Sequence, residues 1–316
     1  MSKWIVIISL ALFSLNCRQA NGKELTRVSM DSIADMVGFR ANGSLRLLAT
    51  RGFEFTISDG SKTQKVVGKG FDKKDIIKCK FSANRERIVA ITGPIRNLLF
   101  TSPLNISYKY HLSAPQGDRE TVVVFTDSLL QLDISQCQSV RNLLCREYQL
   151  TELDVTHNPD LEQLDCSENR LRTLDVSQNR NLQVLFCSKN QLKDIDVIHN
   201  QKLRELVCFD NENLSLDVSA NRNLEFLSCD GLLQELDVTN NIELRTLICR
   251  CKLTALDLSQ NKKLRKLLIS GNNFSAEELN AVFKTLPVVD YYNDTPHPEL
   301  EMSDIPGAEN CDRSLL

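Results

Sequence analysis

The 316-residue sequence predicts a solenoid of short parallel β rungs, with an all-β, sandwich-like domain before it and a helical cap after it. Three residue types recur at a nearly fixed interval, and this periodicity carries the prediction. Six cysteines follow one another at steps of 21, 21, 21, 21 and 20 residues: Cys145, Cys166, Cys187, Cys208, Cys229 and Cys249. Aspartates and asparagines keep the same interval: Asp133, Asp154, Asp175, Asp196, Asp217, Asp237 and Asp257, with Asn158, Asn179, Asn200, Asn221, Asn241 and Asn261. Such an interval indicates one small unit repeated along an axis, which favours recognition over catalysis.

The first residues have the pattern of an export signal. Lys3 precedes an apolar run at 4–15, which has signal-peptide length and is too short to span a bilayer. Residues 1–22 are therefore predicted to be a signal peptide. The residues up to Cys17 resemble a bacterial lipobox, in which this cysteine would be acylated; the alternative is cleavage near Ala20 to give a secreted protein. We expect an exported bacterial protein, held at the outer membrane or cell surface by a lipid anchor or released.

The segment 23–118 contains no repeat and is predicted to be a β-rich N-terminal domain. Short β-rich runs separated by Gly, Asn, Asp and Pro turns are typical of a small β-sandwich. These runs are at 44–50, 53–57, 76–81, 87–91 and 106–110. A short helix is predicted at 32–37. The run at 121–125 is predicted to begin the solenoid, which occupies 119–273.

Each rung of the solenoid is expected to contain two similar halves. Residues 161–171 fit Leu-x-x-Leu-x-(Leu/Cys)-x-x-Asn-x-Leu, the leucine-rich repeat signature, and residues 171–179 repeat its spacing with Val176 in place of the cysteine. Stacking removes the leucines of adjacent rungs from water, at roughly 1.5–3 kcal/mol per side chain. Neighbouring rungs lie about 4.8 Å apart, further than the Cβ separation of a relaxed disulfide, so the cysteines are interpreted as small buried hydrophobes. Cys137 and Cys251 fall near an asparagine position.

Residues 274–316 are predicted to form the cap. Ser275 and Glu278 have the spacing of a capping box, and Phe274 with Leu279 that of a hydrophobic staple. The inward stripe of this helix is expected to consist of Leu279, Val282, Phe283 and Leu286, and Pro287 ends the helix. An edge strand is predicted at 288–292, followed by a polar tail to the C-terminus.

Composition and charge exclude several functions. The chain is 42% hydrophobic and 25% charged, with a net charge of -3 and scattered basic residues, so we expect no nucleic-acid partner. No cofactor, metal or catalytic grouping is expected. The sequence contains four histidines, His111, His157, His199 and His297, and none forms a catalytic grouping. His157 and His199 occupy equivalent turn positions two rungs apart and are interpreted as solvated turn residues. The aspartates are expected to face outward, with backbone N–H groups and Ser or Thr hydroxyls offsetting their repulsion; calcium is the alternative.

The candidate ligand-binding site is an apolar row beside the cysteine strands. Its side chains are expected to point outward on neighbouring rungs and to merge into one exposed patch: Val184, Phe186, Val207, Phe209, Phe226, Ile248 and Leu268. The alternative is that the N-terminal domain, the C-terminal tail or a second copy of the protein covers this row.

The repeated pattern over 130–273 resembles the bacterial internalin-type leucine-rich repeat proteins, in the branch with 21-residue repeats and a cysteine ladder. This resemblance implies a non-enzymatic adhesion or protein-interaction module of the cell envelope that binds a protein ligand. A host cell-surface protein is one candidate for this ligand. The alternatives are a glycan-binding module of an envelope or nutrient-uptake system, and a structural spacer of the envelope.

Overall fold

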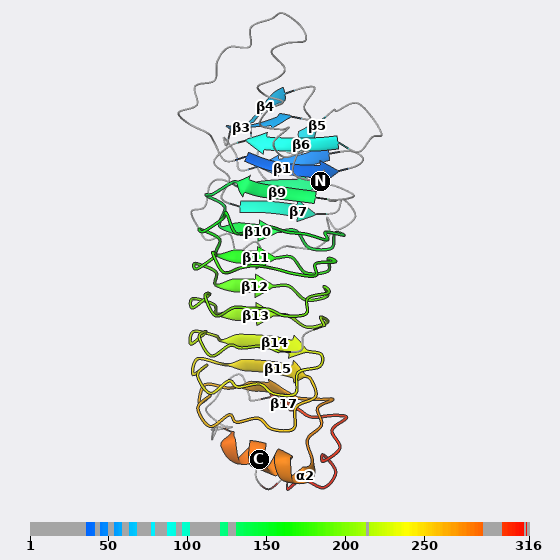
Figure 1. Cartoon of the computed structure of the whole chain (residues 1–316), viewed down its shortest axis with the longest axis vertical. Coiled ribbons are helices and arrows are strands. Elements are labelled where there is room, and N and C mark those ends of the chain that lie inside the picture. The colour runs from blue at the N-terminus through cyan, green and yellow to red at the C-terminus, as the bar shows by residue number, and fades with distance from the viewer. Residues whose placement is uncertain are drawn as a thin grey trace, which may run out of the picture.

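The computed structural model describes residues 36–41, 45–49, 54–58, 63–67, 77–79, 87–92, 97–101, 121–125, 131–212, 215–286, 299–312 and 314. The signal peptide, Cys17 and the predicted strands at 106–110 and 288–292 lie outside these ranges. Before residue 131 the description concerns the backbone. Two β-sheets and one helix organise the described chain (Figure 1).

The repeats form a stack of parallel strands, as predicted, and the strands of this stack lie in the cysteine halves of the rungs. Both halves are predicted to be strand-like, but among the described residues the valine half forms a strand in the first rung alone, at Gln131–Gln136. The strands are β10 (Asn142–Leu144), β11 (Gln163–Asp165), β12 (Val184–Phe186), β13 (Glu205–Val207), β14 (Phe226–Asp230), β15 (Thr246–Arg250) and β16 (Lys266–Leu268). Each strand pairs with the next in sequence, and the middle leucines stay in register from Leu143 to Leu267. Figure 1 shows these strands one below another along the long axis.

The core lies between the two halves of each rung. The middle leucines and the six ladder cysteines are all at most 1% exposed, except Leu267 at 3%. The ladder cysteines are buried thiols, which confirms their interpretation as small core residues. The valine half of each rung contributes a matching set of buried side chains, among them Val155, Val176 and Val197. The two halves of each rung and the adjacent rungs therefore bury these apolar residues together, as expected of a repeat protein.

Buried asparagines connect adjacent rungs in the valine half. Asn200, fully buried, donates from Nδ2 to the carbonyl oxygens of Val176 (3.0 Å) and Asn179 (2.9 Å), both in the preceding rung. The other five members of this column make equivalent bonds: Asn158, Asn179, Asn221, Asn241 and Asn261. The turn position predicts an asparagine that satisfies the backbone of its own bend. Its side-chain bonds go instead to carbonyl groups of the preceding rung, so they link one rung to the next.

The cysteine half contains a second asparagine column. Asn190 donates from Nδ2 to the carbonyl oxygens of Cys166 and Cys187, and its Oδ1 accepts from the N–H of Leu171. Asn169, Asn211 and Asn272 bond in the same way. This column is interrupted between Asn211 and Asn272.

The aspartate column is stabilised within each turn. Every Asp in the column accepts a hydrogen bond at Oδ1 from the backbone N–H two residues later, at 2.8–3.0 Å. In two turns a threonine hydroxyl also donates, as Thr156 does to Asp154 at 2.7 Å. These bonds lower the pKa of Asp175, Asp217 and others, because they favour the charged carboxylate. The predicted structural role of the column is confirmed.

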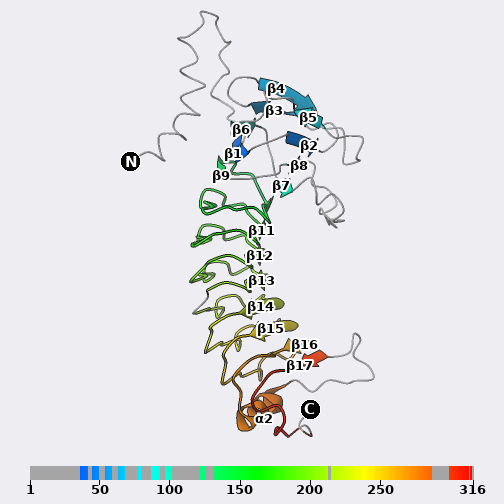
Figure 2. The same cartoon turned by 90° about the vertical axis from the view of Figure 1, so that its right-hand side faces the viewer.

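The N-terminal segment contains eight described strands in two sheets. They are β1 (Met36–Ala41), β2 (Leu45–Ala49), β3 (Glu54–Ser58), β4 (Thr63–Val67), β5 (Ile77–Cys79), β6 (Arg87–Thr92), β7 (Asn97–Thr101) and β8 (Thr121–Phe125). One sheet has the order β4-β3-β6-β1-β9, where β9 (Gln131–Gln136) belongs to the first repeat. The other continues the solenoid sheet through β7, β8, β2 and β5 (Figure 2).

Four predicted strands, at 44–50, 53–57, 76–81 and 87–91, coincide with β2, β3, β5 and β6. The helix predicted at 32–37 is wrong for Met36 and Val37, the two residues of this range that the structure describes, because they begin β1 and pair with β6. The run at 121–125 does not stand next to the first repeat strand: β7 lies between β8 and β10, pairing in parallel with both. The closed sandwich and the domain boundary near residue 118 stay predictions.

Helix α2 (Ala276–Thr285) lies at the far end of the solenoid. The predicted capping box forms, because the Ser275 Oγ accepts from the Glu278 N–H and the Glu278 carboxylate accepts from the Ser275 N–H. Leu279, Val282 and Phe283 are buried in the core, whereas Leu286 is half-buried. The segment predicted as a polar tail contains a strand, β17 (Glu299–Glu301), which pairs in parallel with β16.

Candidate functional site

The outward surface of the solenoid sheet consists of two rows of side chains that flank the buried leucines. Strand alternation places residues on either side of each inward leucine on the opposite face. One row contains Gln163, Val184, Glu205, Phe226, Thr246 and Lys266 in register. The other contains Asp165, Phe186, Val207, Ser228, Ile248 and Leu268. All of the predicted apolar side chains except Phe209 therefore share one face.

Most of these apolar side chains are half-buried, so they present edges and not whole side chains to solvent. This holds for Val184, Phe186, Val207, Phe209, Phe226 and Ile248. Leu268 is an exception, with 7% of its surface exposed, and its assignment to an exposed patch is wrong. The physical reason is β17, which continues the sheet so that Glu301 stands beside Leu268.

The apolar surface is concentrated around β12, β13 and β14. Phe186 and Val207 are direct neighbours across two parallel strands, and Phe226 lies diagonally from Val207 on the next strand. Polar residues interrupt both rows, with the exposed Glu205 between Val184 and Phe226, and Ser228 between Val207 and Ile248. We define Val184, Phe186, Val207 and Phe226 as the apolar patch. Phe209 lies in the turn after β13.

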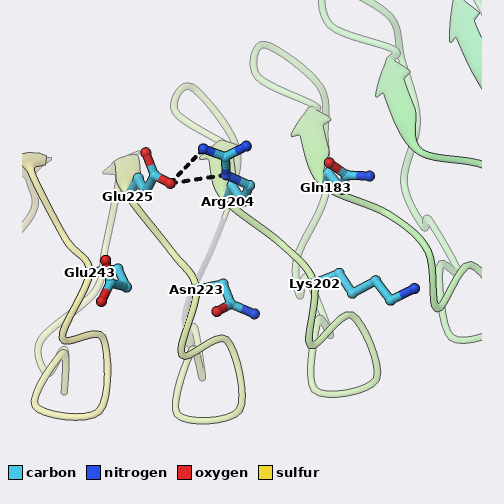
Figure 3. Close-up of a pocket in the computed structure, with 6 residues that line it drawn as sticks. All are labelled: Gln183, Lys202, Arg204, Asn223, Glu225 and Glu243. Carbon is cyan, nitrogen blue, oxygen red and sulfur yellow. Dashed lines mark hydrogen bonds and ion pairs between the residues drawn. The ribbon is translucent and has the colours of Figure 1, made fainter.

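Charged side chains border the patch. Beyond the ends of the strands, Glu168 bonds to Arg146 at 2.6 Å and to Lys189 at 3.1 Å across three rungs. Before the strands, Arg204 donates from Nε and Nη2 to the Glu225 carboxylate at 3.0 and 2.7 Å (Figure 3). These pairs are exposed, so each contributes little to stability.

A shallow hollow lies between rungs next to the Arg204–Glu225 pair. Figure 3 shows its lining, which consists of Gln183, Lys202, Arg204, Asn223, Glu225 and Glu243. Lys202 also bonds to Asn181 at 2.7 Å, and Glu243 bonds to Lys263 at 2.6 Å. Arg204, Glu225 and Glu243 are thus paired with opposite charges, whereas Lys202 bonds to a neutral amide.

The histidines of the repeats lie on exposed turns, as predicted. His157 Nδ1 is 3.7 Å from the Asp154 carboxylate and 3.2 Å from the Thr156 hydroxyl. His199 is also exposed. The other two histidines lie outside the described residues.

One group of side chains was not predicted as a unit. The sulfur atoms of Cys229, Cys249 and Cys251 lie within 4.8 Å of one another, and all three residues are at most 1% exposed. The Cys249 and Cys251 sulfurs are 3.2 Å apart. Hydrogen bonds from the thiols of Cys229 and Cys249 lower the pKa of Cys251 to about 5. The signal in the sequence was the shortened step near Cys251, together with a cysteine at an asparagine position.

Within the described residues, no helix has the length and hydrophobicity needed to cross a bilayer.

The repeat signature and the stacked parallel strands together define a leucine-rich repeat solenoid. The sequence matches no family model and no curated protein. Among solved structures it is similar to the functional domain of InlJ from Listeria monocytogenes, which includes a cysteine ladder: identity is 28% and the TM-score 0.44, over 56% of this chain and 42% of that one.

Two further similar structures are a leucine-rich repeat protein of Leptospira interrogans and the internalin InlF of Listeria monocytogenes. The first has 23% identity and a TM-score of 0.47, over 54% of this chain and 45% of that one. The second has 18% identity and a TM-score of 0.49, over 56% of this chain and 52% of that one. The chain therefore spans about half, or less, of each of these structures.

Proposed function

We propose that this protein is a non-enzymatic interaction module that binds a protein ligand through the apolar patch. The observation that carries the proposal is the placement of two phenylalanines and two valines on adjacent strands of one rigid sheet, each half-buried with an edge in solvent. Aromatic side chains surrounded by polar groups are the usual anchors of protein interfaces.

The scaffold supports binding because it is ordered before the ligand arrives. The backbone beneath the patch is fixed by the parallel ladder, by buried leucines and by the two asparagine columns. A ligand therefore orders little of this protein on binding, which lowers the entropic cost of association. The exposed Glu205 within the patch favours a ligand surface with a basic group beside an apolar centre.

We further propose that the protein acts in the bacterial cell envelope, exported by residues 1–22 and anchored through acylated Cys17. The support is the signal-like N-terminal sequence. Labelling of the expressed chain with a palmitate analogue tests the anchor. Incorporation that disappears in Cys17→Ala supports acylation, and release of an unlabelled, shortened chain would contradict it.

The binding test compares the full chain with two double variants. Phe186→Ala with Phe226→Ala removes both aromatic anchors of the patch. Ile198→Ala with Ile242→Ala is the matched control, because these isoleucines are 42% and 52% exposed and lie on turns of the valine half. Each immobilised protein is incubated with a host-cell surface extract and, in parallel, with a glycan array.

Each truncated anchor is expected to cost about 1–2 kcal/mol of binding free energy, which weakens the affinity for a captured protein by roughly 5- to 30-fold. We expect this loss in the patch variant alone, with both variants keeping the melting temperature of the parent to within a few degrees. Equal capture by both variants would contradict the assigned site. Capture of glycans without any protein would replace the protein ligand by a carbohydrate.

A further inference from the structure

The three buried thiols lie where two consecutive rungs are each one residue short. In the three rungs before them an asparagine stands three residues after the ladder cysteine, as Asn190 does after Cys187. After Cys229 and Cys249 the turn lacks one residue, and no asparagine is present. Gly231 and Cys251 occupy these two shortened turns. The interruption of the second asparagine column is therefore the place where an extra cysteine enters the core.

The backbone compensates for the missing asparagines. Strands β14 and β15 each extend two residues beyond the other repeat strands, so that Cys229 pairs with Cys249 and Asp230 with Arg250. The extended ladder thus runs through the positions at which an asparagine bonds the backbone in the regular rungs. Cys251 is not needed to satisfy this backbone, and its side chain points instead to the cysteine ladder.

The position of Cys251 is fixed by the next rung. The backbone N–H groups of Cys251 and Leu253 both donate to Asn272 Oδ1, at 3.2 and 3.0 Å. Asn272 uses its Nδ2 for the carbonyl oxygens of Cys249 and Ile269, at 2.7 and 2.8 Å. Its amide is fully engaged, so it holds the turn in place and has no atom left to serve as a ligand.

We propose that Cys229, Cys249 and Cys251 form a binding site for a soft, thiophilic metal ion, with Cu(I) as the ion that fits best. Three sulfurs at about 2.3 Å from a central ion stand about 4.0 Å from one another when the ion lies in their plane. The observed separations, from 3.2 Å to at most 4.8 Å, bracket this value. Small side-chain rotations, without a change of the backbone, bring the three sulfurs to bonding distance.

Ligand number favours Cu(I) over Zn(II). Structural zinc is bound by four protein ligands, and three-ligand zinc sites complete their coordination with water. Among the residues that the structure describes, the group contains three sulfurs and no nitrogen or carboxylate ligand, and it is shielded from water. Cu(I) prefers sulfur donors. On binding, the ion displaces thiol protons to solvent.

The site is buried, yet only one turn separates it from the surface. Cys251 stands between the exposed Arg250 and Lys252, and the adjacent shortened turn contains Gly231, which has no side chain, and Leu232, which is 56% exposed. Opening of this turn exposes the thiols without unfolding the stack, because turns have the lowest local stability in a fold.

The test loads the reduced full chain with Cu(I) under anaerobic conditions, in competition with bathocuproine disulfonate. Copper per chain and the sulfur coordination number from X-ray absorption are measured. Cys251→Asn is the main variant, because it introduces the residue that this column has elsewhere. Cys251→Ser is a second variant if the longer side chain disturbs folding. The matched control is Cys166→Ala, a ladder cysteine whose own turn contains Asn169.

We expect one copper per chain with three sulfur neighbours in the parent and in Cys166→Ala, and a higher melting temperature when the ion is bound. Both Cys251 variants lose the stoichiometric copper. Equal loading of the Cys251 variants, or no copper retained against the competitor, would overturn the proposal. A Cys249–Cys251 disulfide in the protein as purified, or retention of Zn(II) in preference to Cu(I), would also overturn it.

Discussion

The bonds of the buried asparagines predict how much a single rung link contributes to stability. Asn200→Ala removes two hydrogen bonds, from Nδ2 to the carbonyl oxygens of Val176 and Asn179. Each such bond contributes about 0.5–1.5 kcal/mol net, so the gross loss is about 1–3 kcal/mol. Both carbonyls keep a backbone donor, the N–H of Asn179 and that of Leu182, each at 3.0 Å. Neither is left without a bond.

The Oδ1 of Asn200 reduces this loss. It is buried and accepts no hydrogen bond from any residue that the structure describes, so the wild-type side chain already carries a desolvation cost. Alanine removes that cost together with the bonds. We therefore expect the free energy of unfolding to fall by about 1–2 kcal/mol, in the lower part of the range.

The assay is urea unfolding of the full chain, followed by circular dichroism, with the slope against urea unchanged. Asn223→Ala is the control, because Asn223 donates one exposed bond to the Gln201 carbonyl, at 3.0 Å. We expect the control to change stability by less than about 0.5 kcal/mol. If Asn200→Ala loses no more than Asn223→Ala, the buried column does not hold the rungs together as argued.

Two further substitutions test the electrostatics and the C-terminal packing. Burial raises the pKa of Asp165, so its charged form costs stability above that pKa, whereas the neutral amide introduced by Asp165→Asn keeps an acceptor for the Ser167 N–H. Asp165→Asn should raise the melting temperature at pH 7, and the difference should shrink as the pH falls through the raised pKa of Asp165 and be lost below the ordinary value of about 4; a constant difference would contradict burial as the cause. A Cβ on Gly307 would clash with the backbone of Ser275 and Ala276. Gly271 is the control, because its φ is positive (76°) but a Cβ there would meet open space. Gly307→Ala should therefore lower the melting temperature more than Gly271→Ala. Equal losses measured by calorimetry would show that the contact relaxes.

The repeats were predictable from the sequence because each structural role recurs. A cysteine at step 21 is weak evidence alone, but six in series fix both the register of the sheet and the burial of every leucine between them. The capping box was predictable for a different reason, since Ser275 and Glu278 bond within one helical turn. Local patterns and periodic patterns are both readable in a single sequence.

The misplaced elements depend on pairing between distant segments. β7 joins β10 and β8 in parallel, and β1 pairs with β9 of the first repeat, across long stretches of chain. β17 has the sequence Glu-Leu-Glu, which contains one apolar residue and little strand propensity; it is a strand because β16 offers it an open edge. The burial of Leu268 follows from that pairing and was invisible beforehand.

The thiol cluster was only partly predictable. The sequence placed Cys251 at an asparagine position and showed the shortened step. Whether its side chain entered the core depended on where the missing residue fell in the turn, and on β15 extending to Arg250. That geometry arises from competition between the ladder and the asparagine for the same carbonyl groups, which local pattern analysis does not capture.

The strand β17 also bears on self-association. A row of parallel strands invites further chains to add at its open end, which is how many β proteins form fibres. This sheet ends in three residues of which two, Glu299 and Glu301, are acidic. A second copy aligning its own β17 there would place like charges side by side, which opposes pairing. The repeat array can therefore be long and regular within one molecule while two copies resist pairing through this end of the sheet.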